Sequence, residues 1–166
     1  TILRAIDKLD RLGIDGVTAL LGEGRLDESG DFTKGAGLDA ASIARVIAFV
    51  SAGQSDYGAT VIALEKAVGN TDAGSEALRE IKAITSIMER CGYGGDRAAI
   101  DTTIVRGLDK YTGPVFEAEH TMRKPNGKPI GVGSVGGGGR YDDLIARFTG
   151  ETMPATGFSI GVSRLI

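Results

Sequence analysis

The chain has 166 residues, of which 42% are hydrophobic and 25% charged, and its formal net charge is -3. This composition is that of a folded globular protein with one core or two small ones, and it excludes a disordered chain. The negative charge excludes an overall basic field that would attract nucleic acid. The one cysteine, Cys91, excludes an internal disulfide and a multi-cysteine metal site.

The length of the apolar runs and the sequence of the N-terminus indicate the cellular location of the protein. No run approaches the roughly 20 apolar residues of a membrane helix, and the N-terminus lacks the order of a signal peptide. We therefore expect a cytoplasmic protein with no membrane contact. Because Thr1 opens inside a helical pattern and Ile166 closes inside an apolar one, we also expect a piece of a longer protein.

Helical periodicity dominates the first part of the chain, residues 1–94. A first helix carries one apolar stripe that Gly13 should end, and Asp39 is the expected N-cap of a second helix. Further helices are predicted over residues 59–68 and from Ser75 to the residue before Gly92. Their stripes consist of Ile2, Ile6, Leu9 and Leu12, then Ile43, Val46, Ile47 and Val50, and last Leu78, Ile81, Ile84, Met88 and Cys91.

The glycine-rich polar segment 22–37 is predicted to be a solvated surface loop. After Gly94 the residues become β-branched and alternating, so strands are expected over 100–105 and 115–122. Residues 124–129, Lys-Pro-Asn-Gly-Lys-Pro, supply turn chemistry, and 130–135 should return antiparallel. His120 and the two glutamates beside it, Glu117 and Glu119, receive no functional role.

The end of the chain, residues 136–166, carries two glycine-rich segments. The four glycines at 136–139 should form a strand-to-helix turn before a short helix that contains Leu144, Ile145 and Phe148. The apolar segment 155–166 has Gly157 and Gly161 one helical turn apart, which favours a tightly packed helix. The sequence thus divides into a helical region, 1–94, and an antiparallel α/β region, 95–166.

The strongest candidate for chemistry is the segment 106–113, Arg-Gly-Leu-Asp-Lys-Tyr-Thr-Gly, which follows a predicted strand. The guanidinium of Arg106 can hold a phosphate through its rigid fork of donors, and Gly107 would let a ligand come close. The structural alternative stays open: Arg106 and Asp109 would form an ion pair, and Tyr111 would be a half-buried residue at a strand end.

Two further segments carry candidate site residues. Residues 136–142, Gly-Gly-Gly-Gly-Arg-Tyr-Asp, leave an open floor over which a small ligand could lie, or else form a flexible turn. Residues 157–164, Gly-Phe-Ser-Ile-Gly-Val-Ser-Arg, suggest a buried segment that ends in a charge. Because an unpaired buried guanidinium is costly, Arg164 should meet an anionic ligand or a structural acidic partner.

In order and spacing these three segments resemble the histidyl-tRNA synthetase family, which has an Arg-Gly-Leu-Asp-Tyr-Tyr motif, a Gly-Gly-Arg-Tyr-Asp motif and a class II motif 3 ending in arginine. The resemblance implies an α/β (α+β) fold, a class II antiparallel sheet flanked by helices with an N-terminal helical insertion region. Residues 1–94 would be the helical linker and insertion region. Residues 95–166 would be the C-terminal half of the catalytic core.

The resemblance also implies histidine activation with ATP and transfer to tRNA(His) by a homodimeric enzyme, with magnesium accompanying ATP and no tightly bound cofactor or protein metal site. Arg106 corresponds to the catalytic arginine at the ATP α-phosphate, and Arg164 with Gly161 to the ATP site, Arg164 at the γ-phosphate. The histidine pocket corresponds to Tyr111, Tyr141, Gly138 and Gly139. Two departures from the family, Lys110 for tyrosine and Ser163 for glutamate, concern the surroundings of these residues.

One other function stays open, that of a histidine-binding regulatory subunit of ATP phosphoribosyltransferase, which is synthetase-like and does not charge tRNA. The presence of both Arg106 and Arg164 favours the synthetase, since a regulator needs no arginine at the α-phosphate. Motifs 1 and 2 and the anticodon-binding domain would lie outside residues 1–166. We therefore expect little or no aminoacylation from this chain alone.

Overall fold

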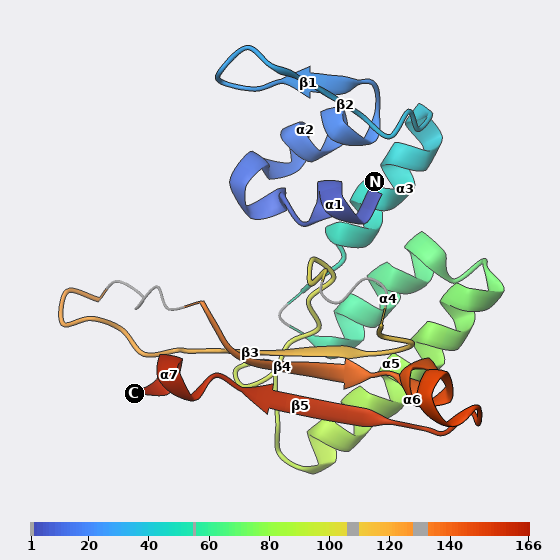
Figure 1. Cartoon of the computed structure of the whole chain (residues 1–166), viewed down its shortest axis with the longest axis vertical. Coiled ribbons are helices and arrows are strands. Elements are labelled where there is room, and N and C mark those ends of the chain that lie inside the picture. The colour runs from blue at the N-terminus through green and yellow to red at the C-terminus, as the bar shows by residue number, and fades with distance from the viewer. Residues whose placement is uncertain (1, 55, 106–109, 128–132) are drawn as a thin grey trace. The chain divides into compact units, whose positions relative to one another are not determined.

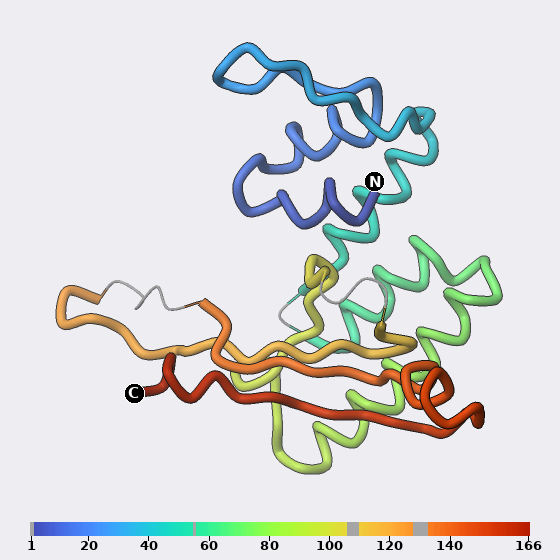
Figure 2. Tube along the Cα trace, in the orientation of Figure 1, coloured from blue at the N-terminus to red at the C-terminus, as the bar shows by residue number. Residues whose placement is uncertain are grey.

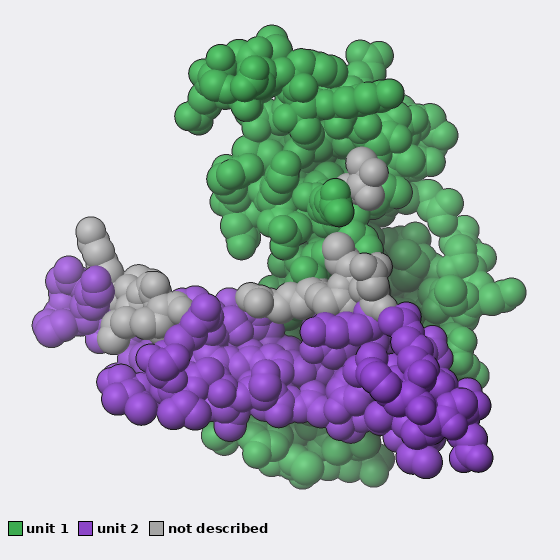
Figure 3. Space-filling model, viewed as in Figure 1, with its two compact units in different colours: residues 1–105 green, residues 106–166 purple. Residues whose placement is uncertain are grey.

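The computed structural model describes residues 2–54, 56–105, 110–127 and 133–166. The chain divides into two compact units, Thr1–Val105 and Arg106–Ile166, which Figure 3 distinguishes by colour. None of the helices in the described part of the chain is long and apolar enough to cross a membrane.

The first unit is mainly helical, as the periodicity predicted (Figure 1). Asp39 caps its third helix by accepting a hydrogen bond from the Ser42 N–H at 2.7 Å, which is the predicted cap and lowers the pKa of that carboxyl. The elements are α1 (Ile2–Ile6), α2 (Leu9–Leu21), β1 (Gly24–Leu26), β2 (Phe32–Lys34), α3 (Ala40–Val50), α4 (Tyr57–Val68) and α5 (Asp72–Arg90).

Two predictions for the start of the chain are wrong. The apolar stripe predicted as one helix is divided between α1 and α2. Gly13 does end a helical segment, as predicted, because its non-helical φ of 65° and ψ of -179° divide α2 by a kink. Segment 22–37 is more than a loop, because β1 and β2 pair antiparallel within it. Asp27 closes the turn between them by accepting from the backbone N–H groups of Ser29 and Asp31, each at 2.9 Å.

Two small apolar cores stabilise this unit. The first joins α1, α2 and α3 and consists of Ala5, Val17, Leu20 and Leu21, with partly buried neighbours such as Ile43 and Val46. The second joins α4 and α5 and consists of Ala52, Val61, Leu64 and Leu78. The tube in Figure 2 shows the turns that connect these helices. The chain length left one core or two small ones open, and the described residues contain these two.

Hydrogen bonds of polar side chains fix the backbone at the C-terminal end of the first unit. The hydroxyl of Tyr57 donates to the Ala98 carbonyl at 2.8 Å, and burial, with the carboxylates of Glu89 and Asp96, raises its pKa. The strand predicted for residues 100–105 is absent: they form turns and irregular backbone. Asp101 accepts from both the N–H and the hydroxyl of Thr103, at 2.8 and 2.6 Å, and such a local turn competes with strand pairing.

The described residues of the second unit form a three-stranded antiparallel sheet in the order β3-β4-β5, with a helix after β4 and another after β5. The predicted strand at 115–122 is confirmed over its first five residues, and residues 130–132 of the predicted return strand lie outside the described residues. The pairing of β3 with β4 shifts register between Ala118 and Glu119. The elements are β3 (Val115–Glu119), β4 (Ser134–Arg140), α6 (Asp142–Thr149), β5 (Thr156–Ile160) and α7 (Val162–Leu165).

Two predictions for the second unit are wrong in the same way. The glycines at 136–139 lie in the central strand β4, where we predicted a turn, and residues 156–160 form strand β5, where we predicted a helix. Each glycine of β4 has partners on both sides, such as Gly138 with Phe116 and Phe158. A glycine run has no alternating pattern of side chains, so its sequence does not predict a strand.

The sheet has no apolar core of its own in the described residues. All the buried hydrophobic side chains among the described residues belong to the first unit. One face of the sheet instead exposes aromatic and aliphatic side chains, including Phe116, Phe158 and Ile160 at 43, 53 and 61%. Exposed apolar surface of this kind needs cover from other parts of a protein.

Substitution of Leu21 by alanine tests the first core. Its side chain has no exposed area, so truncation should lower the free energy of unfolding by roughly 2–5 kcal/mol through lost burial and a cavity. Urea denaturation followed by circular dichroism measures the change. Leu26→Ala is the control, because Leu26 is 63% exposed and should change stability little; equal losses for both variants would refute the assignment of Leu21 to the core.

Candidate functional site

The sheet register gathers several small residues on one face of the second unit. Gly139 lies opposite Val115 on one side and Gly157 on the other, while Gly137 lies between Glu117 and Ser159. Directly opposed residues of antiparallel strands point to the same side, and so do residues two apart along a strand. We call this side the glycine face, formed by Val115, Glu117, Gly137, Gly139, Gly157 and Ser159.

Two tyrosines cover one end of the glycine face. A Cβ atom at Gly139 would lie 2.7 Å from Cδ1 of Tyr111, and one at Gly157 would overlap the hydroxyl of Tyr141. The two rings are tilted by 48° with their centroids 6.5 Å apart. The structure therefore brings Tyr111, Tyr141 and Gly139 together, and it places both hydroxyl-bearing rings where glycine leaves room for them.

The glycine face stays open beside the tyrosines. Of the described atoms, a Cβ atom at Gly137 would meet the Phe116 carbonyl oxygen alone, at 3.4 Å, which is ordinary contact. Gly138 faces the other way, and a Cβ there would overlap the backbone of β5 at Gly157. Gly138 thus serves close strand pairing, whereas Gly137 and Gly139 leave the floor of the face without side chains.

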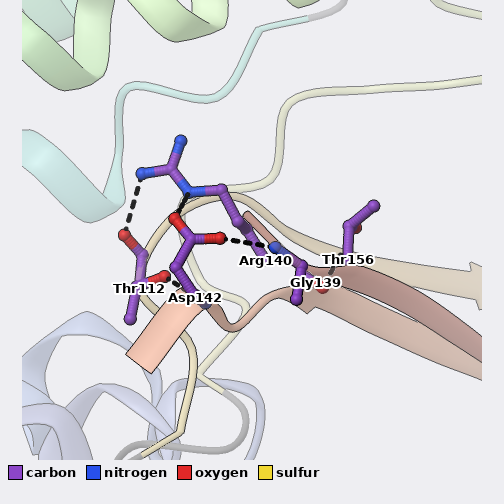
Figure 4. Close-up of polar contacts among 6 residues, drawn as sticks. Thr112, Gly139, Arg140, Asp142 and Thr156 are labelled. Atoms are coloured by element: carbon purple, nitrogen blue, oxygen red, sulfur yellow. Dashed lines mark hydrogen bonds and ion pairs between the residues drawn. The ribbon is translucent and has the colours of Figure 1, made fainter. Parts of the chain in front are cut away.

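An ion pair and its hydrogen bonds fix the backbone on either side of Tyr141 (Figure 4). Nε of Arg140 lies 3.2 Å from Oδ2 of Asp142, and Nη2 of Arg140 donates to the Thr112 carbonyl at 3.1 Å. Asp142 in turn accepts from the Ala155 N–H at 2.8 Å, while its own N–H donates to the Thr112 hydroxyl at 3.1 Å. Charge-assisted bonds of this kind are stronger than neutral ones.

This network ties together the segments that carry the two tyrosines. Thr112 adjoins Tyr111, and its N–H donates to the Arg140 carbonyl at 2.8 Å. Tyr141 donates its own N–H to the Ala155 carbonyl, also at 2.8 Å. The role of Arg140 and Asp142 was missed from the sequence, although opposite charges on either side of a motif tyrosine were a signal that they could pair.

The last helix places Arg164 at the other end of β4. Its guanidinium donates from Nη1 to the Ser134 carbonyl, and the Gly161 N–H donates to the Val135 carbonyl at 2.8 Å. The expected burial of this segment is wrong, since Arg164 is exposed. Ser134 and Arg140 are six residues apart, so Arg164 and the tyrosines are separated by roughly 20 Å of extended strand.

Other predicted residues are placed as follows. Arg106, with Gly107 and Asp109, lies outside the described residues. The ammonium of Lys110, one of the two departures from the family motif, lies 5.6 Å from the centroid of the Tyr111 ring, a cation–π distance. Within residues 110–127 and 133–166, as in the described rest of the chain, no three His, Cys, Asp or Glu side chains gather around a possible metal ion.

Comparison with known proteins gives the family. The family model described as Histidyl-tRNA synthetase matches residues 5–165. The chain is 54% identical to a histidine–tRNA ligase of Jannaschia sp. over 99% of its own length, and 55% identical to one of Rhizobium leguminosarum bv. trifolii over 99%. It spans about a third of these curated relatives, 33 and 32% of their lengths.

Solved structures agree in fold. The crystal structure of histidyl-tRNA synthetase from Nostoc sp. PCC 7120 matches with a TM-score of 0.75 at 27% identity, over 99% of this chain and 34% of that one. A structure titled as an ATP phosphoribosyltransferase regulatory subunit/histidyl-tRNA synthetase from Bacillus halodurans matches with a TM-score of 0.65 at 23% identity, over 98 and 36%. The second likeness concerns the fold alone. With its three motifs, its antiparallel sheet and a family model that matches nearly its whole length, the chain belongs to the histidyl-tRNA synthetase family.

Proposed function

We propose that this chain is the part of a histidine–tRNA ligase that binds the histidine side chain and part of the ATP, within a longer enzyme that forms histidyl-adenylate and charges tRNA(His). The observation that carries the proposal is the pair of tyrosines over the Gly139 and Gly157 positions. Two hydroxyls within one small site can hydrogen-bond the two nitrogens of an imidazole. An apolar side chain of the same size would leave these hydroxyls unpaired and be rejected.

The length of the glycine face suits an extended substrate. Tyr111 and Tyr141 lie at one end of β4, and Arg164 lies at the other, bound to a backbone carbonyl and exposed to solvent. An amino acid at the tyrosines and a triphosphate that ends near Arg164 would together occupy this span. Arginine suits the phosphate end because its planar fork of donors matches phosphate oxygens. This geometry supports the proposed ATP role of Arg164 and of Gly161 beside it.

Arg106 completes the proposed chemistry. Its place in the segment 106–113 supports contact with the α-phosphate, where negative charge develops as the histidine carboxylate attacks and pyrophosphate leaves. Magnesium would enter bound to ATP as part of the substrate. Among the described residues, no group of three His, Cys, Asp or Glu side chains could hold the ion by itself.

The proposed division of labour follows the sequence. Residues 95–166 would supply the second half of the catalytic core, and residues 1–94 the helical linker and insertion region. The exposed apolar face with Phe116, Phe158 and Ile160 supports packing against the remaining two thirds of the enzyme. Dimerisation and a cytoplasmic location belong to the same proposal. Regulation of ATP phosphoribosyltransferase gains no support from the 23% identical structure, because that likeness concerns only the fold.

Removal of the Arg106 guanidinium tests the catalytic assignment. In the full-length enzyme, Arg106→Ala should lower histidine-dependent pyrophosphate exchange by on the order of a hundredfold or more, because a charge on the reacting phosphate is lost. Calorimetric titration should find histidine binding nearly unchanged. Arg123→Ala is the control, since Arg123 donates to the Gly127 carbonyl in the hairpin and is exposed. Unchanged exchange in Arg106→Ala would remove this residue from the mechanism.

Alanine at Gly139 tests the pocket. The new Cβ would lie within 2.9 Å of two Tyr111 ring atoms and of the Pro114 carbonyl oxygen, so the ring must shift. We expect the dissociation constant for L-histidine to rise at least tenfold, while the exposed turn glycine variant Gly150→Asn, at φ 77°, binds normally. Titration calorimetry measures both. Normal histidine binding by a folded Gly139→Ala enzyme would contradict the proposed pocket.

The isolated chain tests the division of labour. Residues 1–166 cover a third of their relatives and leave the apolar sheet face exposed. We expect this chain alone to charge tRNA(His) at no measurable rate, in an assay with radiolabelled histidine that the full-length enzyme passes. Robust charging by the isolated chain would show that the catalytic core is complete within it.

A further inference from the structure

Positive charge in the second unit is concentrated in the connection between β3 and β4. Of the 19 Lys and Arg and the 22 Asp and Glu residues of the chain, residues 1–105 hold 11 and 16, and residues 106–166 hold 8 and 6. The net charge is therefore -5 for the first unit and +2 for the second. Segment 120–128 contains Arg123, Lys124 and Lys128 and no acidic residue. This connection is the part of the second unit that should attract a polyanion.

A tight turn presents two of these cations to solvent. The Gly127 N–H donates to the Lys124 carbonyl at 2.8 Å and closes a turn over residues 124–127. Nη1 of Arg123 donates to the Gly127 carbonyl at 3.1 Å, which fixes its guanidinium against the turn. All residues from Thr121 to Gly127 are exposed. Among the described residues, neither Arg123 nor Lys124 forms an ion pair with an acidic side chain, so both charges are available to a ligand.

The turn lies beyond the end of the glycine face at which Arg164 is found. β4 begins at Ser134, whose carbonyl accepts from Arg164 and whose partner across the sheet is Glu119. Figure 1 shows the chain continuing past the ends of both strands there. Arg123 follows Glu119 by four residues, which is at most roughly 13 Å of extended chain. The cations of the turn thus lie outside the sheet, on the side opposite to the tyrosines.

From these observations we propose that the turn with Arg123 and Lys124 binds the sugar–phosphate backbone of tRNA(His). The inference rests on the proposed function, because it takes the chain to be part of an enzyme that charges this tRNA. Exposed cations on a projecting turn contact phosphates and do not read bases, so they fix the position of an RNA. The guanidinium of Arg123 is already held by the turn, so it loses little freedom when its other donors bind a phosphate.

The triphosphate of ATP has the same chemistry and is the other possible ligand. In the proposed function it ends near Arg164, on the sheet itself. Glu119, opposite Ser134, places a negative charge between that end and the turn, and a carboxylate repels phosphate. A polynucleotide extends far enough to reach the turn while its terminal ribose lies at the adenylate. The position of the turn therefore favours the tRNA over ATP.

The test separates tRNA binding from the chemistry that needs no tRNA. In the full-length enzyme, Lys124→Gln and the double variant Arg123→Gln/Lys124→Gln remove one and two charges. Arg147→Gln is the matched control for Lys124→Gln, because it removes one exposed cation of the same unit at the end of α6. Filter binding of a tRNA(His) transcript at several salt concentrations gives the dissociation constants. Pyrophosphate exchange without tRNA gives the KM values for ATP and histidine, and circular dichroism checks the fold.

We expect Lys124→Gln to weaken tRNA(His) binding roughly threefold to tenfold and the double variant roughly tenfold to a hundredfold, as for loss of one and two phosphate contacts. The slope of log Kd against log salt concentration should fall by about two in the double variant. Both KM values in the exchange reaction should stay as in the wild type. Arg147→Gln should bind the transcript normally. Should the double variant not fold, Lys124→Gln decides alone.

Three outcomes overturn the inference. Unchanged tRNA affinity would remove the turn from the tRNA interface. Equal weakening by Arg147→Gln would show an effect of net charge alone. A raised KM for ATP in exchange would assign Arg123 and Lys124 to the ATP site. Failure of the proposed function looks different, because the wild-type enzyme itself would then neither bind tRNA(His) nor exchange pyrophosphate with histidine.

Discussion

The candidate site depends on the close antiparallel pairing of β4 with a neighbour on each side. Glycine is needed in this strand for two separate reasons. At Gly138 a side chain would collide with the backbone of β5, and at Gly139 it would collide with Tyr111. The run that looks unstructured in the sequence is therefore a paired strand in which at least two positions exclude a side chain. Its lack of side chains creates the floor of the glycine face.

The ion pair of Arg140 with Asp142 helps to hold the segments that carry Tyr111 and Tyr141 against the glycine face. Thr112, Arg140, Asp142 and Ala155 belong to three segments far apart in sequence, and hydrogen bonds join all of them around Tyr141. Because the backbone on both sides of Tyr141 is hydrogen-bonded, the point from which its side chain extends is fixed relative to β4 and β5. Recognition of a small polar ring requires such support around the residues that contact it.

The sequence predicted most of the helices because their apolar stripes and caps are local signals. Asp39 illustrates this, since cap and helix lie within a few residues of each other. Prediction from the sequence failed where pairing with distant residues decides the structure. The glycines of β4 have no side-chain pattern that distinguishes a strand from a turn. In β5 the alternation of Phe158 and Ile160 with Ser159 was a strand signal, but the spacing of Gly157 and Gly161 favoured a helix. Residues 100–105 have strand-forming side chains but no partner in the described chain. Likewise Tyr111 and Tyr141 follow from the motifs, whereas the position of Glu117 follows only from the register.

The register shift between Ala118 and Glu119 has a consequence for how this part of the protein can change. An extra residue accommodated there separates the hairpin tip from the paired rows that contain Glu117 and Gly139. Length changes near the tip can be absorbed on the far side of the bulge. A slip of one position on the near side would exchange the two faces of β3 and set Phe116 where Glu117 stands. The bulge thus allows the length of the hairpin tip to change while the register of the residues on the glycine face stays the same.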